Sequence, residues 1–405
     1  MKQNLDELLK NYKQNLEIIG VSQKNLEDIN LSTEFQSKFR DKTVFKTAYF
    51  NNFSMGFLFK EDWDKIFEEL KKVSLSSNKK ILFIIFNEYF FGKQIFDKNN
   101  KEILFNIIKK YFNETINLKF IFIFINLLVE ENPIDPKNMI IYTKDITIFG
   151  YKLWSSSDKF DIKYEDQNSK WYSNTTYILY NGNPILSYKK SSFADEGIVS
   201  NYIFGSGKFE ILSKIPESNS IQNFINLHIC MDFTVKPYFS LIKELNCDFC
   251  GDAEIRDNFN NLKNYLLNNT NNNDFEKEIN IIISNTISIN VNNLFKNNSL
   301  LVQVDPENNF VCEIKFSKYL EKVLELAKEK HEKLIQYYQN KHIDLENENP
   351  LKKLLIFELQ FNYFQLKKSI LEGNSLGCVY PKKSQVSILK INQGECFMNI
   401  YNLDS

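Results

Sequence analysis

Short apolar runs alternate with amphipathic stretches between residues 43 and 130. The runs KILFIIF at 80–86 and FIFIFINLLV at 120–129 are typical of buried strands, whereas EDWDKIFEELKKV at 61–73 and NKEILFNIIKKYF at 100–112 have helical spacing. From there to residue 190 strand-like runs dominate, and Asn181-Gly182 predicts a tight hairpin. Strands that alternate with helices indicate an α/β sheet.

Both ends of the chain have a different pattern from this central part. Leucines at helical spacing near the start predict a helix, so that residues 1–40 are interpreted as an N-terminal helical arm. A charged amphipathic stretch at 318–338 and a second one from Asn349-Pro350 to Gly373 predict a C-terminal helical extension over residues 316–405, with a small β element near its end. Residues 41–315 then form the main domain.

Composition narrows the class of protein. Hydrophobic residues make up 43% of the chain, which is typical of a folded protein, and the formal charge of −1 offers no field that would attract nucleic acid or an anionic membrane. The apolar run at 120–129 is shorter than the roughly 20 residues that span a bilayer. The abundance of asparagine looks like coding bias, so Asn-rich stretches are given little functional weight and are read as loops.

Cysteine and histidine usage limits location and chemistry. Six scattered cysteines and a polar, amphipathic start without a signal-peptide pattern favour a reducing cytoplasm, although a secreted effector stays open as an alternative. Only three histidines are present, which disfavours a Ser/His/Asp triad or a His-rich metal site. No metal site is therefore predicted. The CxxC at Cys247 and Cys250 lacks a second pair, and FGSGKF at 204–209 departs from a phosphate-binding loop.

Three reactive side chains come at the ends of predicted strands. Glu88 follows ILFIIFN, Lys190 ends ILSYKK, and Cys230 ends FINLHIC just before a predicted helix. A cysteine between a strand and a helix suits a nucleophile, because nearby backbone N–H groups favour a thiolate and an oxyanion. Each residue alone also has an ordinary structural explanation: a solvent-reaching charge or a buried core thiol.

Taken together, NEYFFG, YKK and HICMD resemble the three motifs of the nitrilase-like carbon–nitrogen hydrolases, in the same order. NTTYILYNGNPILSYKK and SLLVQVDPENNFV also resemble that family's paired strands. The resemblance implies an αββα four-layer sandwich and a Glu88, Lys190 and Cys230 triad. Two positions depart from the pattern, since Asn87 replaces a proline and Lys189 an arginine.

The resemblance also implies further roles. The backbone N–H of Met231 would help to hold an oxyanion, Glu196 is the candidate second carboxylate, and Tyr89 and His228 are candidate pocket residues. His228 shares a strand face with Cys230 in a regular strand, but residues at this spacing lie too far apart for a direct hydrogen bond. Pocket lining or a core position is therefore expected for His228.

The resemblance implies hydrolysis of a small-molecule amide through a cysteine thioester, with an amide expected more than a nitrile. It implies no cofactor, and a homodimer is one expected assembly. Two alternatives remain. One is a catalytically inactive nitrilase-like binding or regulatory protein, and the other is an amide- or acyl-transferring enzyme that acts on a protein side chain.

Overall fold

The computed structural model describes about half of the chain. The described residues are 4–23, 60–91, 95–113, 119–131, 146–148, 151–154, 171–190, 205, 208–230, 232, 277–284, 297–306, 309–341, 378–391 and 394–404, with isolated positions between 359 and 370.

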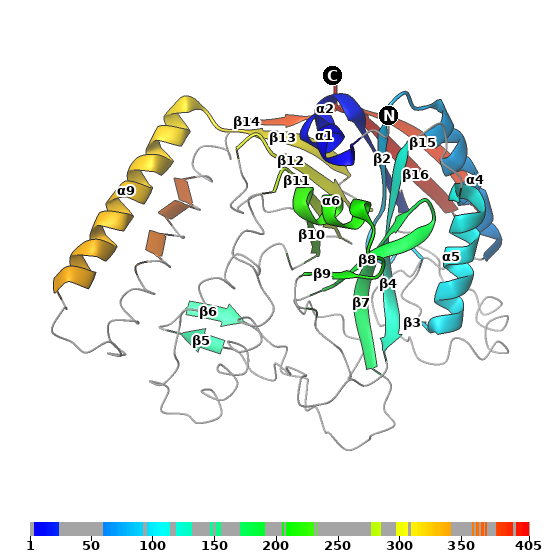
Figure 1. Cartoon of the computed structure of the whole chain (residues 1–405), viewed down its shortest axis with the longest axis horizontal. Helices are drawn as coiled ribbons and strands as arrows, with labels where there is room; N and C mark the ends of the chain where they lie inside the picture. Colours follow the sequence, from blue (N-terminus) through cyan, green and yellow to red (C-terminus); the bar gives the residue numbers. More distant parts are fainter. Residues whose placement is uncertain are drawn as a thin grey trace, which may run out of the picture.

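A nine-stranded mixed sheet is the largest element (Figure 1). Its three central strands, β1, β2 and β4, run parallel, β3 also pairs parallel with β4, and the other strands pair antiparallel. The strand β3 (Ile95–Phe96) pairs with β4 off the main path. In order across the sheet the strands are β15 (Ser384–Ile391), β16 (Gly394–Asn402), β1 (Leu16–Gln23), β2 (Ile81–Phe86), β4 (Phe120–Glu131), β7 (Trp171–Tyr180), β8 (Asn183–Lys189) and β9 (Phe209–Ile211).

A second sheet has five strands in the order β10-β11-β12-β13-β14. The first three are parallel and the last two are antiparallel. Their bounds are β10 (Ile225–Ile229), β11 (Ile279–Ile283), β12 (Leu300–Val304), β13 (Phe310–Lys315) and β14 (Cys378–Pro381). A separate pair is formed by β5 (Ile146–Ile148) and β6 (Tyr151–Trp154).

The two sheets pack face to face. Alternate side chains of β2 and β4, such as Phe83 and Phe124, share one buried cluster with Leu227, Ile281 and Val302 from the five-stranded sheet. This sharing follows from the strand period of two, which places every second side chain on the same face. Burial of each such side chain contributes about 1.5–3 kcal/mol, so the contact between the sheets is the main core.

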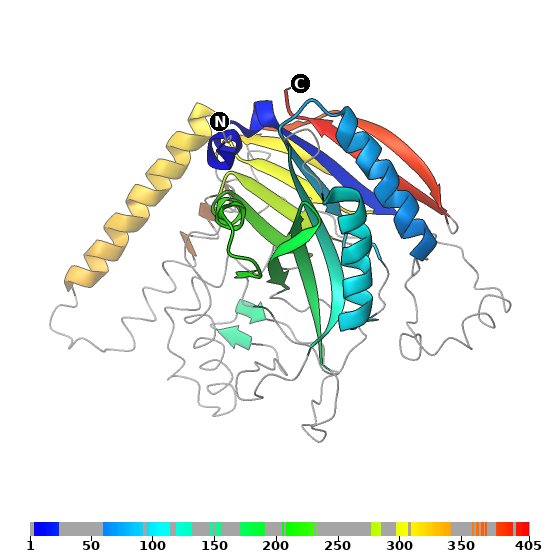
Figure 2. The same ribbon diagram turned by 45° about the vertical axis from the view of Figure 1, so that its right-hand side comes forward.

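Two helices cover the other face of the nine-stranded sheet (Figure 2). They are α4 (Lys60–Ser76) and α5 (Lys98–Phe112), and the N-cap of α5 is Asp97, whose side chain accepts the Asn100 N–H at 2.7 Å. Their apolar faces pack on alternate residues of β2 and β4 in a second buried cluster. The described part of the chain thus has three layers, and the predicted mixed α/β class is confirmed.

The remaining helices lie at the edges of these layers. The short helices α1 (Leu5–Lys10) and α2 (Tyr12–Asn15) lead into β1, and α6 (Pro216–Phe224) leads into β10. The predicted amphipathic helix at 318–338 is confirmed as α9 (Lys318–Lys341), which projects away from the sheets in Figures 1 and 2. Among the described helices, none combines the length and apolar character that a membrane crossing requires.

At both ends of the chain, the structure places in the main sheets strands that the sequence interpretation assigns to appendages. Residues 16–23 were assigned to a helical arm, but they form β1, which lies between β2 and β16 inside the nine-stranded sheet. The expected small β element exists, but β14 extends the five-stranded sheet while β15 and β16 extend the larger one. These strands therefore complete the two main sheets instead of forming appendages. Most of the second predicted C-terminal helix lies outside the described residues.

Candidate active site

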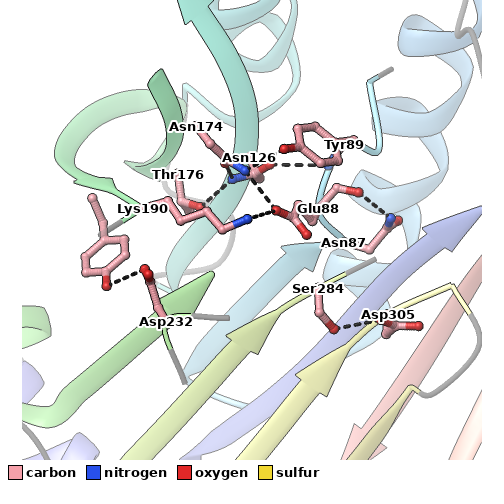
Figure 3. A network of polar contacts seen from close by, with 11 residues as sticks. Asn87, Glu88, Tyr89, Asn126, Asn174, Thr176, Lys190, Asp232, Ser284 and Asp305 are labelled. Carbon is pink, nitrogen blue, oxygen red and sulfur yellow. Dashed lines mark hydrogen bonds and ion pairs between the residues drawn. The ribbon is translucent and has the colours of Figure 1, made fainter. Parts of the chain in front are cut away.

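Three strand ends contribute to one region of the fold. The side chains of Glu88 and Lys190 are in contact there (Figure 3), and the backbones of Glu88 and Cys230 are bound to neighbouring residues at the end of β11. Glu88 comes just after β2, Lys190 just after β8, and Cys230 just after β10. The carboxyl ends of parallel strands are where α/β proteins most often collect functional side chains. The strand-end position that the sequence predicts for each residue is therefore what the structure has.

Glu88 and Lys190 form a fully buried ion pair. The Lys190 Nζ lies 3.1 Å from the Glu88 Oε1, and the two side chains are 1% and 2% exposed. Charges so far from water are stable only with close partners. The Nδ2 of Asn174 supplies a further partner, because it donates to the same carboxylate oxygen at 2.8 Å.

Cys230 occupies a sharp turn at the end of β10. Its φ of 49° lies in the left-handed region, which is sterically disfavoured for residues other than glycine. Backbone strain of this kind is frequent at functional positions. The Cys230 N–H donates to the Ile283 carbonyl at 2.8 Å, which anchors the turn on the neighbouring strand.

The end of β11 holds the backbones of both Cys230 and Glu88. The Glu88 N–H donates across to the Ser284 carbonyl at 3.2 Å, and Ser284 is the residue directly after Ile283. Consecutive Cα atoms are about 3.8 Å apart, so the cysteine turn and the glutamate turn are held on adjacent residues of one strand end. The Ser284 hydroxyl in turn donates to the buried Asp305 carboxylate at 2.7 Å.

A second link joins the lysine strand to the cysteine turn. The Tyr188 hydroxyl donates to the Asp232 Oδ2 at 2.9 Å, and both side chains are buried. Tyr188 precedes Lys190 by two residues and Asp232 follows Cys230 by two. This hydrogen bond therefore fixes the two segments relative to each other across the contact between the sheets.

Asn174 and Asn126 were not predicted from the sequence, yet they contact the site directly. Asn126 on β4 donates through Nδ2 to the Asn174 Oδ1 at 2.6 Å and to the Thr176 hydroxyl at 3.1 Å. The Nδ2 of Asn174 on β7 donates to the Tyr89 hydroxyl at 2.9 Å in addition to Glu88. The available signal was the polar run SNTT at 173–176 inside an otherwise apolar strand, all four residues of which are completely buried.

The remaining candidate residues have separate outcomes. Tyr89 lies in the site, with a left-handed φ of 57°. His228 is completely buried, and strand alternation places it opposite the core-facing Leu227 and Ile229. The expectation that His228 and Cys230 share a strand face is wrong, because β10 ends at Ile229 and the chain turns at Cys230. Glu196 and Met231 lie outside the described residues.

Lys189, which stands where the resembled motif has arginine, faces away from Lys190. Its Nζ pairs with Glu131 at 3.2 Å and with Glu210 at 3.8 Å. Successive strand residues point to opposite faces, so only Lys190 reaches Glu88.

Cys312 and Cys396 are free thiols elsewhere in the described structure. Both are buried, and burial raises the pKa of each to about 12. They therefore lack the thiolate character that a nucleophile needs at neutral pH. The CxxC cysteines lie outside the described residues, and within the described ones no three His, Cys, Asp or Glu side chains lie close enough to hold a metal ion.

Comparison with known protein families finds no match for this chain, and comparison with curated proteins finds none either. Function is therefore inferred from the chemistry of the site.

Proposed function

We propose that this protein hydrolyses non-peptide carbon–nitrogen bonds in the manner of the nitrilase-like enzymes, with an amide preferred over a nitrile as substrate. The observation that carries the proposal is the buried Glu88–Lys190 pair, whose glutamate backbone is anchored at the end of β11 on the residue next to the one that anchors the strained Cys230 turn. A full αββα sandwich is part of the proposal, and the three layers among the described residues support it.

The first half of the reaction forms a thioester. Glu88 takes the proton of the Cys230 thiol, and the sulfur attacks the amide carbon to form a carbon–sulfur bond. Lys190, with the Met231 N–H in the role predicted for it, stabilises the negative charge on the oxygen. When the carbon–nitrogen bond breaks, protonated Glu88 returns the proton to the nitrogen and ammonia or an amine leaves.

The second half releases the acid. Glu88 takes a proton from a water molecule, whose oxygen attacks the thioester carbon. The carbon–sulfur bond then breaks, the acid leaves, and protonated Glu88 returns the proton to the Cys230 sulfur, which restores both the thiol and the carboxylate. Lys190 again faces the developing oxyanion. Because a carboxylate, an ammonium and a thiol carry every step, the proposed enzyme needs neither a metal nor an organic cofactor.

The proposed setting follows the same resemblance. It comprises a small-molecule substrate, a homodimer or larger homo-oligomer, and a cytoplasmic location. No nucleic acid or membrane partner forms part of it, in keeping with the formal charge of −1.

Intact mass spectrometry after incubation with a panel of amides and nitriles tests the proposal. The wild type is expected to gain the mass of an acyl group, and Cys230→Ala is expected to gain none. Cys312→Ala is the matched control, because Cys312 is a buried thiol outside the site, and it should behave as the wild type.

Other outcomes point to the alternatives. An adduct that persists in water but transfers to an added amine or protein side chain identifies an acyltransferase. Absence of any adduct, together with alkylation of Cys230 no faster than that of Cys312, refutes the catalytic proposal and favours a binding protein.

A further inference from the structure

We infer that Asn126 and Asn174 form an oriented amide chain that presents an N–H donor to Glu88 and so maintains this residue as the ionised base. The inference rests on the proposed function and adds two positioning residues to it. Both asparagines are buried, at 1% and 0% exposed, on the neighbouring strands β4 and β7.

The orientation of the chain is set at its far end by a backbone group. The Tyr89 N–H donates to the Asn126 Oδ1 at 3.2 Å. A backbone N–H can only donate, so the Asn126 side-chain oxygen must face it and the Asn126 Nδ2 must face the other way. The left-handed φ of Tyr89 belongs to the turn that aims this N–H at β4.

The orientation then passes to Asn174. The Asn126 Nδ2 meets the Asn174 Oδ1 at 2.6 Å, which leaves the Asn174 Nδ2 to point at the site. Its two hydrogens serve the Glu88 Oε1 at 2.8 Å and the Tyr89 hydroxyl at 2.9 Å. Figure 3 shows this sequence of contacts running from Tyr89 through both asparagines to Glu88.

An amide fixed in this orientation distinguishes between the two states of the glutamate. A carboxylate only accepts hydrogen bonds, whereas a protonated carboxyl group also donates one. The Glu88 Oε1 already faces two donors, the Asn174 Nδ2 and the Lys190 Nζ. Both donors therefore favour the carboxylate form of Glu88 over the protonated one.

Asn174 also connects the glutamate to the lysine. The Lys190 N–H donates to the Asn174 carbonyl at 2.8 Å, so one residue positions the carboxylate with its side chain and the lysine backbone with its main chain. Loss of the side chain should leave this backbone contact intact. A side-chain variant therefore removes the donor to Glu88 while the backbone of Lys190 stays in place.

The test measures the rate at which iodoacetamide alkylates Cys230 as a function of pH, by peptide mapping, since this rate follows the thiolate and needs no substrate. Asn174→Ala removes the donor. Asn126→Asp keeps an acceptor for the Tyr89 N–H but removes the donor to Asn174. Because the aspartate can only accept, the Asn174 amide must turn its N–H group toward it and its oxygen toward Glu88. Asn126→Leu removes the orientation without adding charge.

Each variant is expected to slow alkylation at neutral pH, by about tenfold for Asn174→Ala, which is typical for loss of a hydrogen bond to a charged group. The acid limb of the pH–rate profile should move to higher pH, because Glu88 without this donor remains protonated up to a higher pH. Among the described residues, the titratable groups at this site are Lys190 after β8, Tyr89 beside Glu88, Cys230 after β10, Asp232 with Tyr188, and Asp305 after β12, and the variants leave all of them unchanged.

Two reference variants make the outcomes distinguishable. Glu88→Gln should slow alkylation at least as much as Asn174→Ala does. Asn226→Ala should leave the rate unchanged, because Asn226 is a buried asparagine that donates to Asn280 and not to Asn126, Asn174 or Glu88. Wild-type rates in both Asn174→Ala and Asn126→Asp, with Glu88→Gln slow, overturn the inference and leave the proposed function standing. A wild-type rate in Glu88→Gln overturns the proposed function itself.

Discussion

The buried Glu88–Lys190 pair should be strongly coupled in stability, and a double-mutant cycle measures the coupling. The isosteric changes Glu88→Gln and Lys190→Met each remove one charge and leave the other in a site that is 2% exposed or less. At 3.1 Å and an effective dielectric constant of about 20, the attraction between the charges is about 5 kcal/mol. Loss of one partner of a buried pair costs about 3–5 kcal/mol.

We expect Lys190→Met to be the milder single change, because Asn174 still donates to the Glu88 carboxylate. The double variant should recover most of the loss, since it leaves no unpaired charge in the core. The free energies of unfolding come from urea titrations followed by both fluorescence and circular dichroism, whose coincidence checks that unfolding is two-state. The expected coupling is about 3 kcal/mol or more.

A coupling below about 1 kcal/mol, the magnitude of exposed ion pairs, would refute this reasoning. It would mean that water reaches the two charges in solution. The site would then lack the low dielectric environment on which Lys190 depends for holding an oxyanion.

Three further changes test separate parts of the structure. Gly182→Ala should cost about 2 kcal/mol or more in urea titrations, because φ is +76° and the added Cβ would lie 2.7 Å from the Lys109 Cα; a neutral result would exclude this turn geometry. Cys230→Gly should be about 1 kcal/mol more stable than Cys230→Ala although neither forms an adduct, and equal stabilities would exclude the left-handed φ. Tyr188→Phe should cost about 1–3 kcal/mol because it removes the donor to buried Asp232, and a thermal midpoint equal to that of the wild type would argue against that contact.

Local patterns were sufficient to predict the central strands and helices. The runs at 80–86 and 120–129 are apolar enough to form β2 and β4 without further information, and Asn181-Gly182 closes the β7–β8 hairpin as expected. The helix periodicity at 61–73 and 100–112 likewise corresponds to α4 and α5. In each case the signal lies within one short segment, where residue spacing alone is decisive.

The strand β1 could not be recognised in this way. Its sequence LEIIGVSQ follows directly on residues with helical spacing, which do form α1 and α2. What makes these residues a strand is pairing with β2 on one side and with β16 on the other. Pairing between segments so distant in the chain leaves no local pattern to read.

The site was predictable in its charged members and not in its neutral ones. Glu88 and Lys190 stand out at the ends of apolar runs, whereas Asn126 and Asn174 are single asparagines in a chain where asparagine is abundant. Because the sequence interpretation treats asparagine as a loop residue, it misses Asn126 and Asn174, which are buried within strands. Their role depends on which atoms face Glu88 and Tyr89, which only three-dimensional coordinates give.

The pairing of β1 with β16 also bears on how the chain is made. Gln23 pairs with Cys396, so the partner of β1 emerges from the ribosome about 20 to 75 s after it at ordinary rates of synthesis. Until then one edge of an apolar central strand stays open, and such edges invite pairing with other chains. Folding of the larger sheet is thus completed only after translation of the last strand, and a nascent chain of this protein would gain from a chaperone that covers β1 in the meantime.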